Sequence, residues 1–112
     1  MAVTAGDFDR IETFLRARID PLLAAAQDAS DDGLVIALAA LGRAVQSAHD
    51  IGTDLLKFDQ GLQEMVRERA VDQYWDTLGT IAYEWRAHPD YLSEFELGAI
   101  ELGGVAPLPA AV

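Results

Sequence analysis

The chain has 112 residues, of which eight are Lys or Arg and nineteen are Asp or Glu, so its formal net charge is −11 at neutral pH. This balance excludes an ordinary nucleic-acid-binding protein, because phosphate contacts need a basic surface. Cys is absent, which excludes disulfide frameworks, thiolate metal sites and cysteine nucleophiles. Apolar residues make up 51 % of the chain, enough for one small buried core.

The first predicted helix covers residues 7–27. Asp7 is its predicted N-cap, and Asp9 and Glu12 occupy positions that the helix dipole favours for acids. The apolar residues recur at steps of three and four, as in an amphipathic helix: Phe8, Ile11, Phe14, Leu15, Ile19, Leu22 and Leu23.

Pro21 interrupts this pattern, because proline lacks a backbone N–H and clashes with the preceding turn. Two outcomes stay open. Either the helix kinks at Pro21, or Asp20 caps a second helical piece that begins with the proline.

The second predicted helix covers residues 31–49, with Ser30 or Asp31 as its cap. Residues 34–41 read LVIALAAL, the longest aliphatic run in the chain. A membrane span needs about 20 apolar residues, so the run is predicted to belong to a core helix. The helix is predicted to end at His49 to Gly52, because glycine favours the left-handed backbone that terminates helices.

The third predicted helix is long and covers residues 53–87, with a break near residues 69–72 as the alternative. Its apolar stripe drifts slowly around the helix and consists of Leu55, Phe58, Leu62, Val66, Ala70, Tyr74, Leu78, Ile81 and Trp85. His88 and Pro89 end the pattern. A short helix over residues 90–101 and an extended, uncharged tail are predicted to follow.

These elements predict an all-α protein: a small antiparallel helical bundle with one long helix and an extended C-terminal tail. Residues 1–101 are predicted to form a single helical domain, and residues 102–112 the tail. The small core favours a homo-oligomer or stable heteromer over a lone monomer. No secretory signal is visible at the N-terminus, so a cytoplasmic location is expected.

Catalytic and metal-binding patterns are weak. Glu84 and His88 are four residues apart and would share one helix face, a spacing that can hold a metal. Only two histidines exist, and a metal site needs three or four ligands. His49 lies beside Asp50, but the predicted helix boundary separates it from Thr53. No serine or glycine-rich loop stands in a catalytic context, so we predict no enzyme activity, no cofactor and no metal.

Aromatic residues gather toward the C-terminal end of the helical region. Tyr74 and Trp85 lie on the apolar stripe and are predicted to be in the core, whereas Trp75 and Tyr83 point away from it, with core and interface equally favoured. Trp, Tyr and Arg are enriched at interfaces, and an uncharged tail can dock in an apolar groove. The predicted interface residues are Trp75, Tyr83, Arg86, Tyr91, Val105, Leu108 and Val112.

Two short stretches resemble a family of small uncharacterised actinobacterial and actinophage proteins. Residues 14–20 (FLRARID) resemble the opening FLRARLDED of these proteins, and residues 88–91 (HPDY) resemble an HPDY near their end. The family's tryptophan-containing segment after the first helix is missing here. The resemblance implies an actinobacterial or phage origin and no particular activity.

We therefore predict a non-catalytic protein–protein interaction or assembly protein, such as an adaptor, structural subunit or assembly factor of a phage or bacterial complex. Its partner would be itself or another protein, with no direct nucleic-acid or membrane binding. The alternative is an acidic nucleic-acid mimic that inhibits a DNA- or RNA-binding protein, because the acidic residues fall largely off the apolar stripes.

Overall fold

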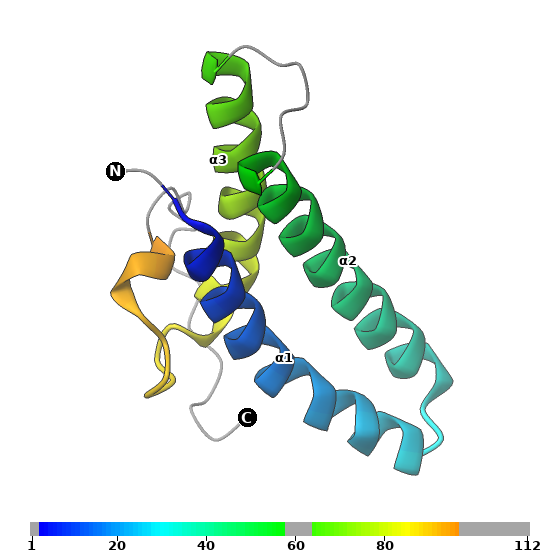
Figure 1. Cartoon of the computed structure of the whole chain (residues 1–112). Coiled ribbons are helices and arrows are strands. Elements are labelled where there is room, and N and C mark those ends of the chain that lie inside the picture. The colour runs from blue at the N-terminus through cyan, green and yellow to red at the C-terminus, as the bar shows by residue number, and fades with distance from the viewer. Residues whose placement is uncertain (1–2, 58–63, 97–112) are drawn as a thin grey trace.

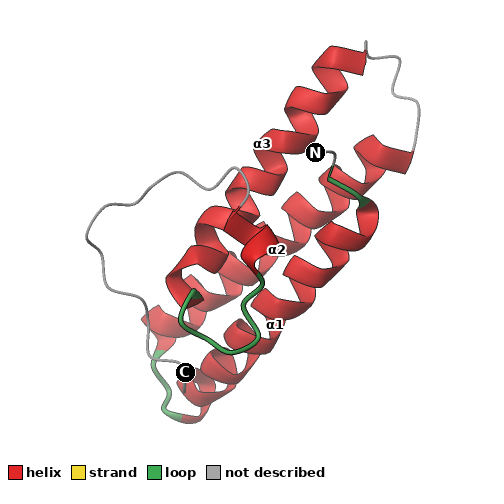
Figure 2. Cartoon of the chain, turned by 90° about the vertical axis from the view of Figure 1, so that its left-hand side faces the viewer, coloured by secondary structure: helices red, strands yellow, loops and turns green. Residues whose placement is uncertain are grey.

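A computed structural model describes residues 3–57 and 64–96, which form three α-helices and two short 3-10 helices (Figure 1). The helices are α1 (Ala5–Asp28), α2 (Asp32–Lys57), α3 (Glu64–Ala82), η1 (Tyr83–Trp85) and η2 (Ser93–Glu96). These residues contain no strand (Figure 2), so the predicted all-α helical bundle is confirmed. The predicted tail over residues 102–112 lies outside the described residues.

α1 begins earlier than predicted and is one continuous helix. Thr4 is its N-cap: the Thr4 hydroxyl accepts a hydrogen bond from the backbone N–H of Asp7 at 3.2 Å, and the Asp7 carboxylate accepts one from the backbone N–H of Thr4 at 2.9 Å. This reciprocal pair is a capping box, so Asp7 supports the cap and is not itself the N-cap. α1 runs through Pro21, and the separate piece that Asp20 would cap does not exist.

α2 begins as predicted but ends later. Asp31 caps it, since the Asp31 carboxylate accepts a hydrogen bond from the backbone N–H of Leu34 at 3.2 Å. The predicted end at residues 49–52 is wrong, because Gly52 lies inside the helix and serves close packing. A Cβ atom at Gly52 would lie 2.5 Å from the ring of Phe8. The missing side chain therefore lets α1 approach the backbone of α2.

The long helix predicted over residues 53–87 is also wrong. Residues 53–57 belong to α2, and α3 begins at Glu64 and ends at Ala82. α3 is continuous through residues 69–72, so the alternative break does not occur there. Of the short helix predicted over residues 90–101, the described residues contain only η2.

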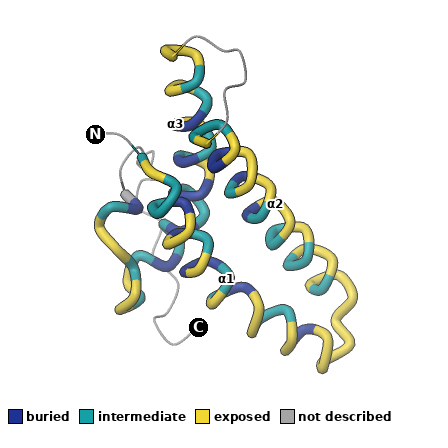
Figure 3. The backbone as a smooth tube through the Cα atoms, in the orientation of Figure 1, coloured by how far each residue is buried: buried dark blue, intermediate teal, exposed yellow. Residues whose placement is uncertain are grey.

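The core lies where α3 packs against the N-terminal part of α1 and the C-terminal part of α2 (Figure 1 and Figure 3). Apolar side chains of all three helices, joined by the segment after α3, fill it: Phe8, Ile11, Phe14, Leu15, Ile19, Val45, Ala48, Val71, Trp75, Leu78, Ala82, Trp85 and Phe95. We call this part of the molecule the base.

Beyond the base, α1 and α2 continue as a two-helix hairpin that α3 does not reach (Figure 1). We call residues 20–44 the arm. Between Leu22 and Leu41 only Ala26 is buried, and Figure 3 shows the arm as largely exposed or intermediate. The aliphatic run belongs to α2, which supplies Val45 and Ala48 to the core, as predicted. The run itself is largely uncovered, with Leu34 46 % exposed and Ile36 67 % exposed.

Candidate functional site

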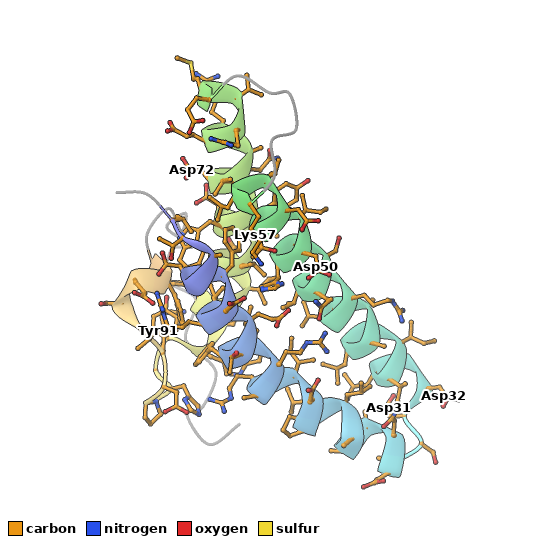
Figure 4. All side chains as sticks on the ribbon, viewed as in Figure 1. Asp31, Asp32, Asp50, Lys57, Asp72 and Tyr91 are labelled. Carbon is orange, nitrogen blue, oxygen red and sulfur yellow. The ribbon has the colours of Figure 1, made fainter. Side chains whose placement is uncertain are left out.

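A histidine and three carboxylates meet between α1 and α2, where the side chains of both helices fill the space beside Asp50 (Figure 4). Nε2 of His49 lies 2.7 Å from Oδ1 of Asp9. Nδ1 of His49 lies 2.9 Å from Oδ1 of Asp50 and 3.4 Å from Oε2 of Glu12. The His49 side chain is 15 % exposed. The imidazole therefore bridges the two helices through both ring nitrogens, and we call these four residues the His49 cluster.

The continuity of α2 builds its half of this cluster. The hydroxyl of Thr53, one turn further along α2, donates a hydrogen bond to the backbone oxygen of His49 at 2.9 Å. The side-chain amide of Gln46 donates to Asp50 at 2.8 Å, and its amide oxygen accepts from Arg16 on α1. A cation thus reaches the edge of the cluster through Gln46, and it does not contact the imidazole directly in the described residues.

Asp9 and Glu12 were missed as site residues, because their position near the N-terminus of a helix already explains acidic side chains. A signal was nevertheless present. In an antiparallel hairpin, residues equally far from the turn lie at the same level, and Glu12 and His49 are about equally far from Ser30. The register of the predicted hairpin would have paired them.

The carboxylates raise the pKa of His49. Burial by itself favours the neutral imidazole, but hydrogen bonds to Asp9 and Asp50 and the charge of Glu12 outweigh it. In return, hydrogen bonds from His49 and then from Gln46 lower the pKa of the Asp50 carboxyl. In the absence of a metal, the cluster therefore favours a protonated imidazole.

Stability of the metal-free protein is expected to depend on pH through His49. A raised folded-state pKa means that protonation contributes its full stabilisation below the ordinary value of 6.5, and that the contribution is lost as pH rises through the raised pKa. Urea unfolding with a chelator, at about pH 6 and about pH 8.5, measures it. His49→Gln should flatten this pH dependence and His88→Gln should retain it. The same slope in both variants would contradict the expectation.

Trp75 lies in the core. Its indole is 3 % exposed and packs edge-on against Phe8, with ring centroids 5.6 Å apart. The structure thus decides between the two equal predictions for Trp75 and removes it from the exposed surface. Trp85 is buried as predicted, and Tyr74 packs partly buried against the core.

The other described interface candidates are half-buried. The guanidinium of Arg86 lies 4.0 Å from the centre of the Tyr83 ring, and Tyr91 packs edge-on against Phe14 at 5.8 Å. The structure brings Tyr83 and Arg86 together and places Tyr91 beside α1. The three remaining candidates lie outside the described residues: Val105, Leu108 and Val112.

Glu84 and His88 do not form the predicted pair on one helix face, because α3 ends at Ala82. Nε2 of His88 lies 2.6 Å from a guanidinium nitrogen of Arg18. Nδ1 of His88 accepts a hydrogen bond from the backbone N–H of Asp90 at 3.0 Å. The same guanidinium nitrogen also lies 2.9 Å from Nδ1 of His88. The single lone pair of a neutral imidazole is thus engaged by Arg18 or Asp90 and is not offered to a metal beside Glu84.

Two of the cavities in the described part of the chain are not lined by His49. One of about 390 Å³ lies beside α1, against Phe95, and its guanidinium groups are already paired, Arg10 with Glu94 at 2.9 Å and Arg18 with Asp90 at 3.7 Å. The other, of about 380 Å³, lies between Val3 and the facing ends of α2 and α3. Neither gathers polar groups around one point as the His49 cluster does.

The chain matches no known protein family, no curated protein and no solved structure.

Proposed function

We propose that the chain is a non-catalytic interaction or assembly protein, which joins a second copy of itself through the arm. The exposure of the arm supports this: only Ala26 is buried between Leu22 and Leu41, although that stretch contains the longest aliphatic run. Exposed apolar surface of this kind marks sites of protein association. α3 supplies a third helix at the base, and a partner would supply further helices at the arm.

A second copy fits the arm by charge. The tip carries Asp28, Asp31 and Asp32, and Figure 4 shows Asp31 and Asp32 at the turn between α1 and α2. Arg43 lies on α2 at the other end of the arm and is exposed. Two arms packed antiparallel about a two-fold axis would place the acidic tip of each beside Arg43 of the other. The product would be a four-helix bundle that covers both apolar surfaces.

A second candidate rests on the net charge of −11: an acidic inhibitor that occupies the basic site of a nucleic-acid-binding protein. Salt separates the two. Binding between opposite charges weakens steeply as salt rises, whereas association through apolar surface does not.

α2 is also long and apolar enough, by length and composition alone, to cross a membrane. This is weak support for a membrane segment, because core helices of soluble proteins pass the same test. Gln46 and His49 of α2 are moreover engaged with α1. A helix held in this way favours a protein partner over lipid.

Light scattering of the intact chain, over a range of protein and salt concentrations, tests the proposal. We expect a salt-insensitive multiple of 12.1 kDa. The double variant Leu34→Gln/Ile36→Gln should become monomeric. Met65→Gln is the matched control, because Met65 is 66 % exposed, as Ile36 is 67 % exposed, but lies on α3. Its mass should stay that of the unmodified chain.

If the unmodified chain is monomeric at every concentration, the proposal of self-association is contradicted. Dissociation of Met65→Gln as complete as that of the arm variant would contradict the arm as its site. Flotation of the unmodified chain with neutral phospholipid vesicles, abolished in the arm variant, would assign the arm to lipid instead.

A further inference from the structure

The charges of the His49 cluster do not balance. Asp9, Glu12 and Asp50 surround one imidazole, which carries at most a single positive charge. Arg16 reaches the cluster only through Gln46. Two negative charges are therefore left without a counter-ion in contact, in a chain whose net charge is already −11.

Glu12 carries the second observation. Its Oε2 atom is buried and accepts no hydrogen bond from the described residues, although it lies 3.4 Å from Nδ1 of His49. The Glu12 side chain is 21 % exposed, and its ion pair with His49 leaves the acceptor positions of Oε2 unfilled by any hydrogen bond from the described residues. A bound cation would supply the missing partner.

The spacing of the donor atoms suits a metal ion. A tetrahedral ion with bonds of about 2.0–2.2 Å to nitrogen and oxygen holds its ligand atoms about 3.3–3.6 Å apart. Nδ1 of His49 lies 3.4 Å from Oε2 of Glu12 and 2.9 Å from Oδ1 of Asp50, and ligand atoms of the three residues lie within 4.8 Å of one another. The first of these distances already lies in that range, and the second is shorter than it.

Asp9 supplies the usual support for a ligating histidine. Its carboxylate lies 2.7 Å from Nε2 of His49. When a metal displaces the Nδ1 proton, Asp9 would hold the remaining proton on Nε2 and leave the Nδ1 lone pair facing Glu12 and Asp50. Metal-binding histidines commonly have a carboxylate on the other ring nitrogen, which fixes the tautomer and the ring orientation.

We propose that Glu12, His49 and Asp50 bind one divalent transition-metal ion of the Zn²⁺ class, with Asp9 as the positioning residue. One imidazole and two carboxylates suit Zn²⁺ better than Mg²⁺, which prefers oxygen ligands alone. Three protein ligands leave a fourth position for water. Because Glu12 lies on α1 and the other two ligands on α2, the ion would join the helices at the base.

Thermal unfolding of the intact, tag-free chain tests the proposal after treatment with a chelator, with ZnCl₂ or MgCl₂ added back. A ligand at a hundredfold excess over its dissociation constant raises the Tm of a domain of this size by about 10 °C. We expect such a rise with Zn²⁺ and a much smaller one with Mg²⁺. His49→Gln and Glu12→Gln should lose the rise.

His88→Gln is the matched control. His88 is the only other histidine, and its side chain is 13 % exposed, against 15 % for His49. This variant should keep the full Zn²⁺ response. If His88→Gln loses the Zn²⁺-induced rise in Tm, or if His49→Gln keeps that rise, the assignment is overturned.

A second measurement does not depend on the folding of any variant. In NMR spectra of the unmodified chain, one equivalent of Zn²⁺ should shift the imidazole resonances of His49 and leave those of His88 unchanged. Equal shifts of both histidines, or no shift at one equivalent, would overturn the proposal.

Discussion

Replacing Trp75 with alanine is expected to lower the free energy of unfolding by about 3–5 kcal/mol. The indole packs edge-on against Phe8 of α1 and lies 6.4 Å from the ring of Phe95, beyond α3. Its removal leaves a cavity where α1, α3 and the C-terminal segment meet, and surrounding groups fill such a cavity only in part. Small domains are stable by about 5–15 kcal/mol, so the loss is a large share of the total.

Chemical denaturation followed by circular dichroism measures this loss, and Trp75→Phe is its control. Nε1 of Trp75 is buried without a hydrogen-bond partner among the described residues. Phenylalanine therefore removes an unpaired donor together with part of the volume, and the loss should be about 1.5 kcal/mol or less. Equal losses in the two variants would contradict the packing described for the indole. If Trp75→Ala leaves the stability unchanged and weakens self-association, Trp75 is an interface residue.

Gly52→Ala is expected to destabilise the chain by about 1–3 kcal/mol, although alanine is the better helix former. The new methyl group would lie 2.5 Å from two ring carbons of Phe8. Phe8 is fully buried and is held by Trp75, so the ring can move aside only by disturbing the core.

Gly42→Ala is the matched control, because Gly42 lies in the same helix and a Cβ atom there would meet nothing within 4 Å. Without a clash, the higher helix propensity of alanine should stabilise the chain by about 0.5–1 kcal/mol. Thermal or urea unfolding of both variants measures the difference. A stabilising Gly52→Ala would contradict the close approach of Phe8 to α2.

The presence of the helices could be predicted from the sequence, because apolar spacing records which side of a helix faces inward. The α1 residues Phe8, Ile11, Leu15 and Ile19 follow that spacing, and all four are buried. The helix start near Ser30 or Asp31 was also predictable, because serine and aspartate side chains accept hydrogen bonds from the free backbone N–H groups at the start of a helix.

The end of α2 could not be predicted in the same way. A glycine late in a helix either ends it or admits a neighbouring side chain. These two uses look the same in one sequence, and the choice at Gly52 is set by Phe8, which is remote along the chain. The division of the predicted long helix follows from this, since residues 53–57 continue α2.

The exposure of the aliphatic run could not be predicted for a different reason. Periodicity shows that Leu34, Leu38 and Leu41 share a side of α2, but not whether another helix is long enough to cover them. α3 ends at Ala82 and covers only the base. The His49 cluster likewise needed the register of α1 against α2, which no local pattern contains.

The arm is expected to unfold and refold without disturbing the base, because short helices are marginal in water when tertiary packing is weak. Opening costs least where few apolar contacts are buried, so amide hydrogens around Leu34 and Leu38 should exchange with solvent well before those around Leu15 and Val45. The chain then contains two cooperative units of unequal stability. Covering the arm would merge them, so that association and the final step of folding become one event.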